Sequence, residues 1–270
     1  MHTQPALPIR TGSRRVLPQH SHRPCTNVTC SPSDARAAHL RNVAAAVDVQ
    51  ALHVAFGSGN LRRMVLQGVD LRIHRGTLHM ILGPNGCGKS TLLKVLGGLV
   101  PATSGQVNMD LPTGFVFQNP DHQVIMPTVA ADVAFGLGRY DLPADTVKQA
   151  VQQALRLVNM ERFMSSGTHT LSGGQRQRVA IAGALAEGPR VLLLDELTTF
   201  LDMEDQFGVL AAVGPTVGAT AGPVTAVWVT HRFEELEYAD QASYMEEGRV
   251  VFTGSPQEMR AFLSSLGAPV

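Results

Sequence analysis

Residues 83–90, with the sequence GPNGCGKS, constrain the fold of this chain more than any other segment. They fit the pattern G-x-x-x-x-G-K-[ST], in which glycines let successive backbone N–H groups turn inward toward phosphate oxygens. The ammonium of Lys89 would then reach the β- and γ-phosphates of a nucleotide, and the hydroxyl of Ser90 would bind Mg²⁺. Residues 78–82, which are apolar apart from His79, predict a buried strand before this loop, and residues 90–96 predict a helix whose positive N-terminus faces the same anion. The sequence therefore predicts an α/β fold with a phosphate-binding loop between a strand and a helix.

The overall composition limits the classes of function that remain. At 270 residues the chain has the length of one large domain or two small ones, and 44% of it is hydrophobic. The 22 basic and 22 acidic side chains cancel, so no net charge attracts nucleic acid or an anionic membrane. No apolar run approaches the roughly 18 residues that cross a bilayer. We therefore expect no nucleic-acid binding and no transmembrane segment, so that any membrane role requires a partner protein.

The three cysteines do not form a disulfide framework. Cys25 and Cys30 could form half of a metal site, but no second pair of ligands follows them. Cys87 lies inside the phosphate loop, where we interpret it as a small filling residue. The alternative is an oxidation-sensitive thiol in an electropositive nest.

The first 46 residues differ in composition from the rest of the chain. They contain a single acidic residue, Asp34, several Ser and Pro, and arginines at positions 10, 14, 15, 23, 36 and 41. They lack the hydrophobic region of a secretory signal, and their composition is typical of an organelle transit peptide, whose removal residues 43–46 would suit. The alternative is an untargeted disordered tail. We expect residues 1–46 to be disordered and the folded domain to begin near Val47, where residues 47–54 alternate like an edge strand.

A second apolar strand has acidic residues at its end. Residues 191–194 are apolar and lead into Asp195 and Glu196. This pattern predicts a central parallel strand, and ligands bind at the carboxyl ends of such strands. Asp195 is placed to hold Mg²⁺, and Glu196 to orient or polarise an attacking water. The alternative is a surface strand end whose two acids serve solubility alone.

Residues 171–175, with the sequence LSGGQ, precede another predicted helix over residues 176–185. Ser172 can cap this helix, and the adjacent Gly173 and Gly174 provide a second anion-binding surface. An ordinary capped helix is the alternative. That alternative does not explain why a chain with one phosphate nest contains another.

The P-loop, the LSGGQ segment and the Asp195-Glu196 strand, in this order, resemble the ABC ATPases over nearly everything from Val47 to about Phe262. The resemblance implies the P-loop NTPase fold of an ABC-type nucleotide-binding domain over residues 47–270. Such a domain has a mostly parallel core sheet, an antiparallel β subdomain and a helical subdomain, here about residues 119–185. In this family two domains pack head to tail, and each ATP lies between one P-loop and the partner's signature motif. The chain would therefore pair with itself or with a related ABC ATPase.

The resemblance also implies roles for individual residues. Gln118, after the apolar run 115–117, resembles the Q-loop glutamine, and His231, after residues 227–230, resembles the switch histidine that contacts the γ-phosphate. Asp202 resembles the D-loop aspartate, which lies across the dimer interface. The implied catalytic residues are Glu196, His231 and Gln118. The implied metal ligands are Ser90, Asp195 and Gln118. The implied nucleotide-binding residues are Gly83, Pro84, Asn85, Gly86, Cys87, Gly88, Lys89, Ser90, Thr91, Ser172, Gly173, Gly174, Gln175 and Asp202.

Two positions depart from the family pattern. An aromatic residue near the first strands usually stacks on adenine, but the expected position is Ser58, two residues after Phe56. This departure leaves open which side chain contacts the base. The segment after Glu196 usually begins Pro-Thr and here begins Leu197-Thr198, which can change the D-loop conformation while leaving both acids intact.

Residues 117–123 and 129–136 are similar to the ATPases of energy-coupling-factor and cobalt-type importers, which take up vitamins and metal ions. They also resemble plastid non-intrinsic ABC proteins of plants and algae. In the importers this region receives short helices of a transmembrane coupling protein, with which Asp121 would form an ion pair. The alternative is a solvated turn, since Asn-Pro-Asp is good turn chemistry. Residues 141–164 predict a helix in the subdomain that faces this partner.

The resemblance thus implies an ATPase subunit that uses ATP and Mg²⁺ to drive a separate membrane protein, for import of a metal ion or a vitamin-like molecule. It favours a location on the stromal side of a plastid membrane. A mitochondrion, or the cytoplasmic face of a membrane if the N-terminus is no transit peptide, are the alternatives. The alternative function is a soluble, non-transport ABC ATPase, such as one serving iron–sulfur cluster assembly. Cargo selectivity lies in another chain in such systems, so the transported substrate is not encoded here.

Overall fold

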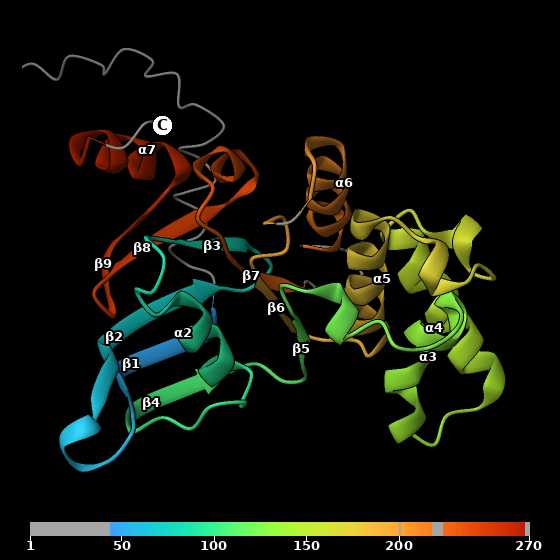
Figure 1. The fold of residues 1–270 in the computed structure, drawn as a ribbon, viewed down its shortest axis with the longest axis horizontal. Coiled ribbons are helices and arrows are strands. Elements are labelled where there is room, and N and C mark those ends of the chain that lie inside the picture. Colours follow the sequence, from blue (N-terminus) through green and yellow to red (C-terminus); the bar gives the residue numbers. More distant parts are fainter. Residues whose placement is uncertain (1–43, 200, 218–223, 268–270) are drawn as a thin grey trace, which may run out of the picture.

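A computed structural model of the chain describes residues 44–199, 201–217 and 224–267. Figure 1 shows two sheets with helices packed around them. The strands are β1 (Ala45–Phe56), β2 (Arg63–His74), β3 (Leu78–Leu82), β4 (Ser104–Met109), β5 (Thr113–Val116), β6 (Val191–Asp195), β7 (Thr225–Val229), β8 (Gln241–Glu246) and β9 (Arg249–Gly254). The α-helices are α2 (Lys89–Leu96), α3 (Val129–Phe135), α4 (Ala144–Leu157), α5 (Gly173–Ala186), α6 (Met203–Val213) and α7 (Pro256–Ser265). The 3₁₀-helices are η1 (Gly59–Leu61), η2 (Pro120–His122), η3 (Gly136–Arg139), η4 (Glu161–Phe163), η5 (Thr168–Thr170), η6 (Gly214–Thr216) and η7 (Phe233–Tyr238).

The smaller sheet is antiparallel, in the order β2-β1-β4. Its first strand begins at Ala45, two residues before the predicted start of the domain. The prediction that this segment is an edge strand is wrong, because β4 pairs with the side of β1 that β2 leaves open. The alternation of β1 instead comes from the burial of Val47, Val49, Leu52 and Val54 on one face. The predicted transit peptide falls almost entirely in residues 1–43, which precede the part described.

The larger sheet has the order β5-β6-β7-β3-β8-β9. Its neighbours from β5 to β8 are parallel, and β9 runs antiparallel to β8. Every residue of β3, β6 and β7 is buried. A continuous apolar run is what a parallel strand needs when both of its faces are covered. The predicted strands at 78–82 and 191–195 are thus confirmed as neighbours of β7 in a mostly parallel core.

The hydrophobic core has two parts, one on each face of the larger sheet. Leu192 and Leu194 of β6 pack in the part formed with α3 to α7, whereas Val191 and Leu193 pack in the part that contains α2 and the antiparallel sheet. Successive side chains of a strand point to opposite faces, which produces this division. Helix α2 is therefore held between the two sheets.

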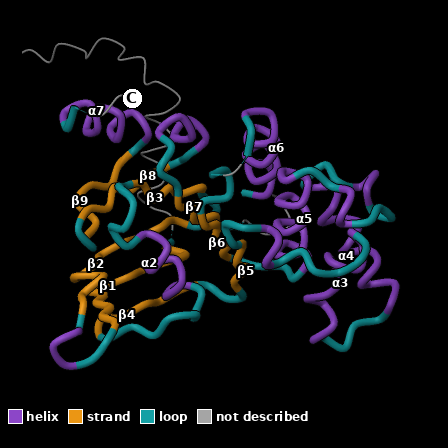
Figure 2. The backbone as a smooth tube through the Cα atoms, viewed as in Figure 1, coloured by secondary structure: helices purple, strands orange, loops and turns teal. Residues whose placement is uncertain are grey.

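The helical half of the molecule contains α3, α4 and α5, which pack against one another (Figure 2). Helix α4 is shorter than the predicted span of 141–164: it begins after Pro143, and Asn159 beyond its end has a φ of 57°. A left-handed residue of this kind ends a helix. Among the described helices, none has both the length and the apolar character needed to cross a bilayer.

The order of the parallel strands determines which loops meet. The P-loop follows β3, Asp195 ends β6, and the segments leading to Gln118 and His231 follow β5 and β7. These four strands occupy consecutive places in the sheet, in the order β5, β6, β7, β3. Their carboxyl ends lie at one edge, where ligands bind in open α/β sheets.

Candidate functional site

The glycines of the P-loop are required by its backbone. Gly83, Gly86 and Gly88 have φ angles of 145°, 79° and 111°, which L-residues rarely adopt. A Cβ atom on Gly83 would overlap the carbonyl oxygen of Met245, and one on Gly88 would lie 2.8 Å from the Cδ2 atom of Leu66. The loop therefore lies directly against β2 and β8, with its backbone turned around a nest.

Lys89 is folded back over this nest. Its side chain is buried, and its ammonium donates hydrogen bonds to the carbonyl oxygens of Gly83 at 2.8 Å and Pro84 at 3.0 Å. Two neutral carbonyls do not neutralise a buried cation, so the site favours an anion beside it. Ser90 and Thr91 follow in the first turn of α2, whose N-terminus faces the same space.

Ser90 and Asp195 form an oxygen pair beside the loop. The Ser90 hydroxyl donates to Asp195 Oδ1 at 2.8 Å. Burial raises the pKa of Asp195, while the hydrogen bond from Ser90 and the charges of Lys94 and Lys89 act in the opposite direction. A hydroxyl and a carboxylate are the hard oxygen donors that Mg²⁺ prefers, so these residues fit the predicted metal.

Three predicted residues meet at the carboxylate of Glu196. Gln118 Nε2 donates to Glu196 Oε2 at 3.2 Å, and His231 Nδ1 lies 3.5 Å from the same oxygen. Thr199, which the sequence did not single out, also donates to this atom at 3.3 Å. Glu196 has a left-handed φ of 46°, held in part by the hydrogen bond from its N–H to Val229 O at 3.0 Å. Such strain at a non-glycine residue is typical of functional sites.

The signature segment caps α5 as predicted. Ser172 Oγ accepts from the N–H of Gln175 at 3.2 Å, and Gln175 Oε1 accepts from the N–H of Ser172 at 3.0 Å, which is a capping box. A carboxylate from α6, that of Asp205, accepts from the N–H of Gly174 at 3.2 Å and from Ser172 Oγ at 3.2 Å. In the described part of the chain, no hydrogen bond joins residues 172–175 to the P-loop. One chain therefore presents two separate anion-binding surfaces.

The D-loop is connected to α6 and to the switch loop. Asp202 Oδ1 accepts from the N–H of Asp205 at 2.8 Å and so caps α6. Gln206 Nε2 donates to Leu201 O at 2.6 Å, and Gln206 Oε1 accepts from Arg232 Nη1 at 3.0 Å. These contacts tie the D-loop to the residue that follows His231. Nothing in the local sequence pattern predicted them.

The segment after Glu196 is packed into the core. Leu197, which replaces the usual Pro, is 1% exposed and belongs to the main hydrophobic cluster. Thr198 donates to the carboxylate of Glu235 in η7. Burial raises the pKa of Glu235, and hydrogen bonds from Thr198 and Thr230 act against it. Leu197, in place of the usual Pro, therefore packs in the core, and Asp195 and Glu196 keep their predicted positions.

Cys87 is buried and forms no disulfide among the described residues. Burial raises the pKa of its thiol, although the charge of Lys89 acts in the opposite direction. A buried thiol with a raised pKa is poorly reactive, which agrees with the role of a small filling residue. Cys25 and Cys30 belong to the undescribed N-terminal residues.

The segment after β1 and a hollow beside the P-loop bear on the question of what contacts the base. Ser58 is exposed and Phe56 is 46% exposed. A hollow of about 430 Å³ lies between β2, the loop tip from Pro84 to Cys87 and the β8–β9 turn. Neither observation identifies a side chain that stacks on a base.

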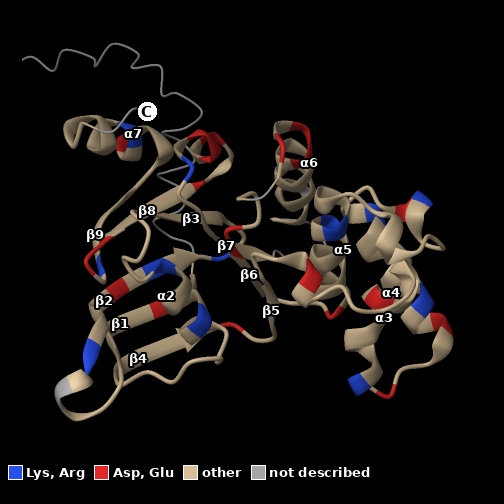
Figure 3. Cartoon of the chain, viewed as in Figure 1, with Lys and Arg blue, Asp and Glu red and all other residues tan. Residues whose placement is uncertain are grey.

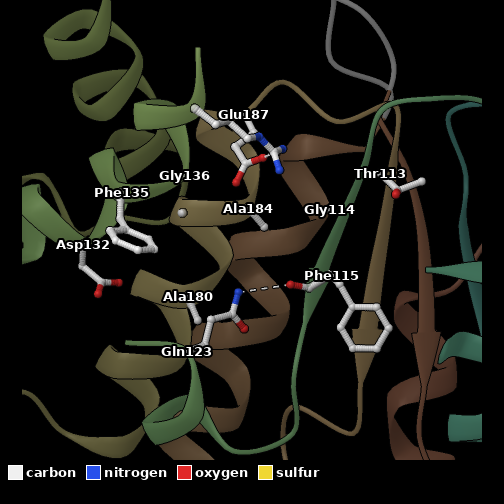
Figure 4. A pocket seen from close by; sticks show the side chains of 12 residues that line it. Thr113, Gly114, Phe115, Gln123, Asp132, Phe135, Gly136, Ala180, Ala184 and Glu187 are labelled. Atoms are coloured by element: carbon white, nitrogen blue, oxygen red, sulfur yellow. Dashed lines mark hydrogen bonds and ion pairs between the residues drawn. The ribbon is translucent and has the colours of Figure 1, made fainter. Parts of the chain in front are cut away.

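A groove of about 240 Å³ separates the edge strand β5 from the helices (Figure 4). Phe135 and Asp132 come from α3, and Gln123 Nε2 donates to Phe115 O at 3.1 Å. Asp132 is buried and accepts from the N–H groups of Ile125 at 2.8 Å and Met126 at 2.9 Å, so it fixes the segment after Gln118 against α3. The groove is lined by Thr113, Gly114, Phe115, Gln123, Asp132, Phe135, Gly136, Arg139, Ala180, Gly183, Ala184 and Glu187.

Asp121 lies beside this groove in η2, the turn that Asn-Pro-Asp predicted. Its carboxylate lies 3.2 Å from Nε of Arg176 on α5. Asp121 therefore already has a basic partner within the chain, which weakens the expectation that it pairs with a coupling protein.

Buried charge is concentrated around the candidate site. Basic and acidic positions are scattered over both halves of the molecule (Figure 3). Among the described residues, the buried Lys, Asp and Glu side chains are Lys89, Asp132, Asp195 and Glu235. Since burying a charge is costly, such groups are kept where a hydrogen-bond network or a bound ligand requires them. Lys89 belongs to the P-loop and Asp195 ends β6. Asp132 lies in α3, which follows the Gln118 segment, and Glu235 lies in η7, which follows His231.

Comparison with known sequences identifies the family. A family model described as ABC transporter matches residues 66–199. The chain is 52% identical over 261 residues to ABC transporter I family member 10 of Arabidopsis thaliana, covering 96% of this chain and 91% of that protein. It is 43% identical over 213 residues to the energy-coupling factor transporter ATP-binding protein EcfA1 of Symbiobacterium thermophilum, covering 74% of each.

Solved structures share the fold. The structure of cbiO1 from Clostridium perfringens, part of the ABC transporter complex cbiONQ, matches with a TM-score of 0.74 at 33% identity and covers 83% of this chain and 93% of its own. The ATP-binding cassette MJ0796, a dimer in a post-hydrolysis state bound to ADP and Pi, matches with a TM-score of 0.67 at 27% identity and covers 78% and 98%. The predicted fold and the predicted role as an ATPase subunit of an ABC-type transporter are confirmed. The chain belongs to the ABC transporter family, as an ATP-hydrolysing subunit.

Proposed function

We propose that Glu196 is the catalytic carboxylate of this ATPase and that Gln118 and His231 position it. The observation that carries the proposal is the meeting of both side chains at Glu196 Oε2, next to the Ser90–Asp195 pair. Glu196 would orient and polarise the attacking water, while Gln118 and His231 hold the carboxylate and the water in line with the γ-phosphate. Catalysis here rests mostly on positioning and on electrostatic stabilisation.

The P-loop residues bind and neutralise the phosphates in this proposal. The backbone N–H groups of residues 83–88 and the ammonium of Lys89 surround the β- and γ-phosphates. Ser90, Asp195 and Gln118 would hold Mg²⁺, which when bound neutralises charge on the β- and γ-phosphate oxygens. Thr91, in the first turn of α2, extends the set of phosphate-binding groups toward the α-phosphate.

We propose that each ATP-binding site is completed by a second ABC ATPase subunit. Among the described residues no hydrogen bond joins residues 172–175 to their own P-loop, which supports this. The dimeric MJ0796 structure with ADP and Pi supports it as well. Ser172, Gly173, Gly174, Gln175 and Asp202 would then face the partner's nucleotide. The partner is a second copy or a related ATPase.

The groove beside β5 is proposed as the docking site for a helix of a membrane-embedded coupling protein. It lies next to the segment after Gln118, so an occupant would contact the loop that reaches Glu196. Phe135, 60% exposed, provides an apolar contact at its mouth. EcfA1 belongs to an energy-coupling factor transporter and cbiO1 to the cbiONQ complex. These relatives support a transport role, and we propose import of a metal ion or a vitamin-like molecule.

We propose that residues 1–46 direct the chain into a plastid, where the ATPase lies on the stromal side of a membrane. The Arg-rich, acid-poor composition and the Arabidopsis relative support this. Removal of the peptide before Ala45 would leave β1 complete. Import assays with isolated chloroplasts and mitochondria, followed by N-terminal sequencing of the imported chain, distinguish the two organelles and locate the cleavage site.

The E196Q substitution tests the catalytic proposal. Gln keeps the shape of the side chain but removes the charge that accepts from water, so phosphate release should fall by about 100-fold or more. ATP binding should persist, as measured by equilibrium binding of a labelled nucleotide. The matched control is E234Q, an exposed acid in η7, which should hydrolyse ATP like the wild type. Hydrolysis by E196Q close to the wild-type rate would contradict the assignment.

A further inference from the structure

The N-terminus of α5 already has an anion from its own chain. The Asp205 carboxylate accepts from the N–H of Gly174 at 3.2 Å, and its two oxygens lie 3.2 and 3.5 Å from Ser172 Oγ. A Cβ atom on Gly174 would overlap the Asp205 carboxylate. The carboxylate therefore lies directly against the backbone of Gly174, in space that the missing side chain leaves open.

The groups that Asp205 engages are those that a phosphate would need. A backbone N–H and a hydroxyl at the start of a 14-residue helix are donors that suit any small anion, and the helix dipole favours negative charge there. A phosphate oxygen and the Asp205 carboxylate cannot use these donors together, since they occupy the same space and repel each other.

We infer that Asp205 is an internal competitor for the nucleotide phosphate that residues 172–175 receive from a second copy of this chain. The inference rests on the proposed ATP site between two subunits. Binding of the second copy's ATP displaces the carboxylate from Ser172 and Gly174. Asp205 thereby raises the ATP concentration at which two copies pair.

Displacement of the Asp205 carboxylate from residues 172 and 174 does not disturb α6. Asp205 is in the first turn of α6, where a negative charge is favourable in its own right. The cap of α6 comes from Asp202, which accepts from the backbone N–H of Asp205 at 2.8 Å and does not depend on its side chain. Release from the signature segment therefore leaves α6 intact, and replacement of the side chain preserves the helix start.

The test is an ATP titration of pairing in the full chain, with the E196Q substitution in every protein so that bound ATP persists. The molar mass is followed by size-exclusion chromatography with light scattering. D205N removes the charge and keeps the shape, and its matched control is E204Q, an exposed acid one residue earlier on the same turn. The D205N chain should pair at an ATP concentration about threefold lower or less, and E204Q should pair like its parent.

The outcomes distinguish failure of the role of Asp205 from failure of the shared ATP site. Pairing of D205N and E204Q at the same ATP concentration overturns the inference and leaves the shared ATP site standing. A parent chain that stays monomeric at every ATP concentration overturns the shared site between copies, and the inference with it. If thermal melting shows D205N to be unfolded, D205A provides the same comparison, because it also removes the charge without altering the Asp202 cap.

Discussion

At the scale of single residues, the P-loop glycines are required for two different reasons. Gly83 passes so close to the Met245 carbonyl that a methyl group has no room. Gly86 faces open space, and only its φ of 79° demands glycine. Glycine is therefore required at position 83 by close packing as well as by its φ of 145°, and at position 86 by backbone conformation alone.

His79 is a buried histidine that the catalytic site does not use. It lies in β3, and Nε2 is 2.9 Å from Ser243 Oγ. Burial, together with the charge of His74, lowers the pKa of His79 to about 3. In the unfolded chain the His79 ring is protonated below about pH 6.5, whereas in the folded chain it is protonated only below about pH 3. The stability that neutral His79 contributes is therefore fully present above pH 6.5 and is lost as the pH falls toward 3.

We expect the H79Q variant to lose part of this acid sensitivity, because Gln can contact Ser243 but does not titrate. Between pH 6.5 and pH 5 the wild-type free energy of unfolding should fall by about 2 kcal/mol more than that of H79Q. Urea unfolding at the two pH values measures this difference. The H169Q control, at an exposed histidine, should keep the wild-type slope. Equal slopes for H79Q and the wild type would refute the assignment.

At the scale of elements, α7 shows how local sequence fixes a helix. Ser255 is its N-cap, Pro256 occupies the first turn, and Glu258 completes a capping box. Met259 and Leu263 are buried, and the ring of Phe262 stacks on that of Phe252, with centroids 4.6 Å apart. The cap and the apolar face agree, and the helix packs against β8 and β9.

Loss of the α7 cap should cost stability and leave catalysis unchanged. The S255A substitution removes the hydroxyl that accepts from the N–H of Glu258 at 3.3 Å, and should lower the free energy of unfolding by about 1 kcal/mol. Chemical denaturation measures the loss, and the ATPase rate serves as the second readout. The control is S264A, near the end of the same helix, which should cost less. A larger loss in S264A than in S255A would argue against the capping role.

At the scale of the whole molecule, the groove beside β5 lies next to the segment that follows Gln118. Its wall includes α3, whose Asp132 holds residues 125 and 126, and Gln123, which lies five residues after Gln118. Glu187 forms an ion pair with Arg139 at the other end. Movement of an occupant would therefore reach Glu196 through Gln118, which is how ATP hydrolysis and a membrane partner can be coupled.

The F135D substitution should break this coupling by weakening docking. Exposed Phe135 would contribute about 1.5–3 kcal/mol of apolar burial, so its loss should lower affinity for the membrane partner by about 10-fold or more. Affinity purification from detergent-solubilised organelle membranes, with quantitative mass spectrometry, measures recovery of a polytopic protein. ATP hydrolysis by the isolated chain should not change. The L61D control, at an exposed residue of η1, should keep full recovery, and equal recovery with F135D would remove the groove from the docking proposal.

The sequence by itself determined the local parts of this protein: the P-loop, the buried strand before it, the acids at the end of β6 and the cap of α5. Motif spacing and apolar runs are properties of a few neighbouring residues, so they can be interpreted without the fold. Only the tertiary structure decided that β1 is central in its sheet, that Thr199 joins Gln118 and His231 at Glu196, and that Asp205 occupies the start of α5. Gln118 and His231 follow β5 and β7, which lie on either side of β6. The order of parallel strands is a long-range property that local periodicity does not contain.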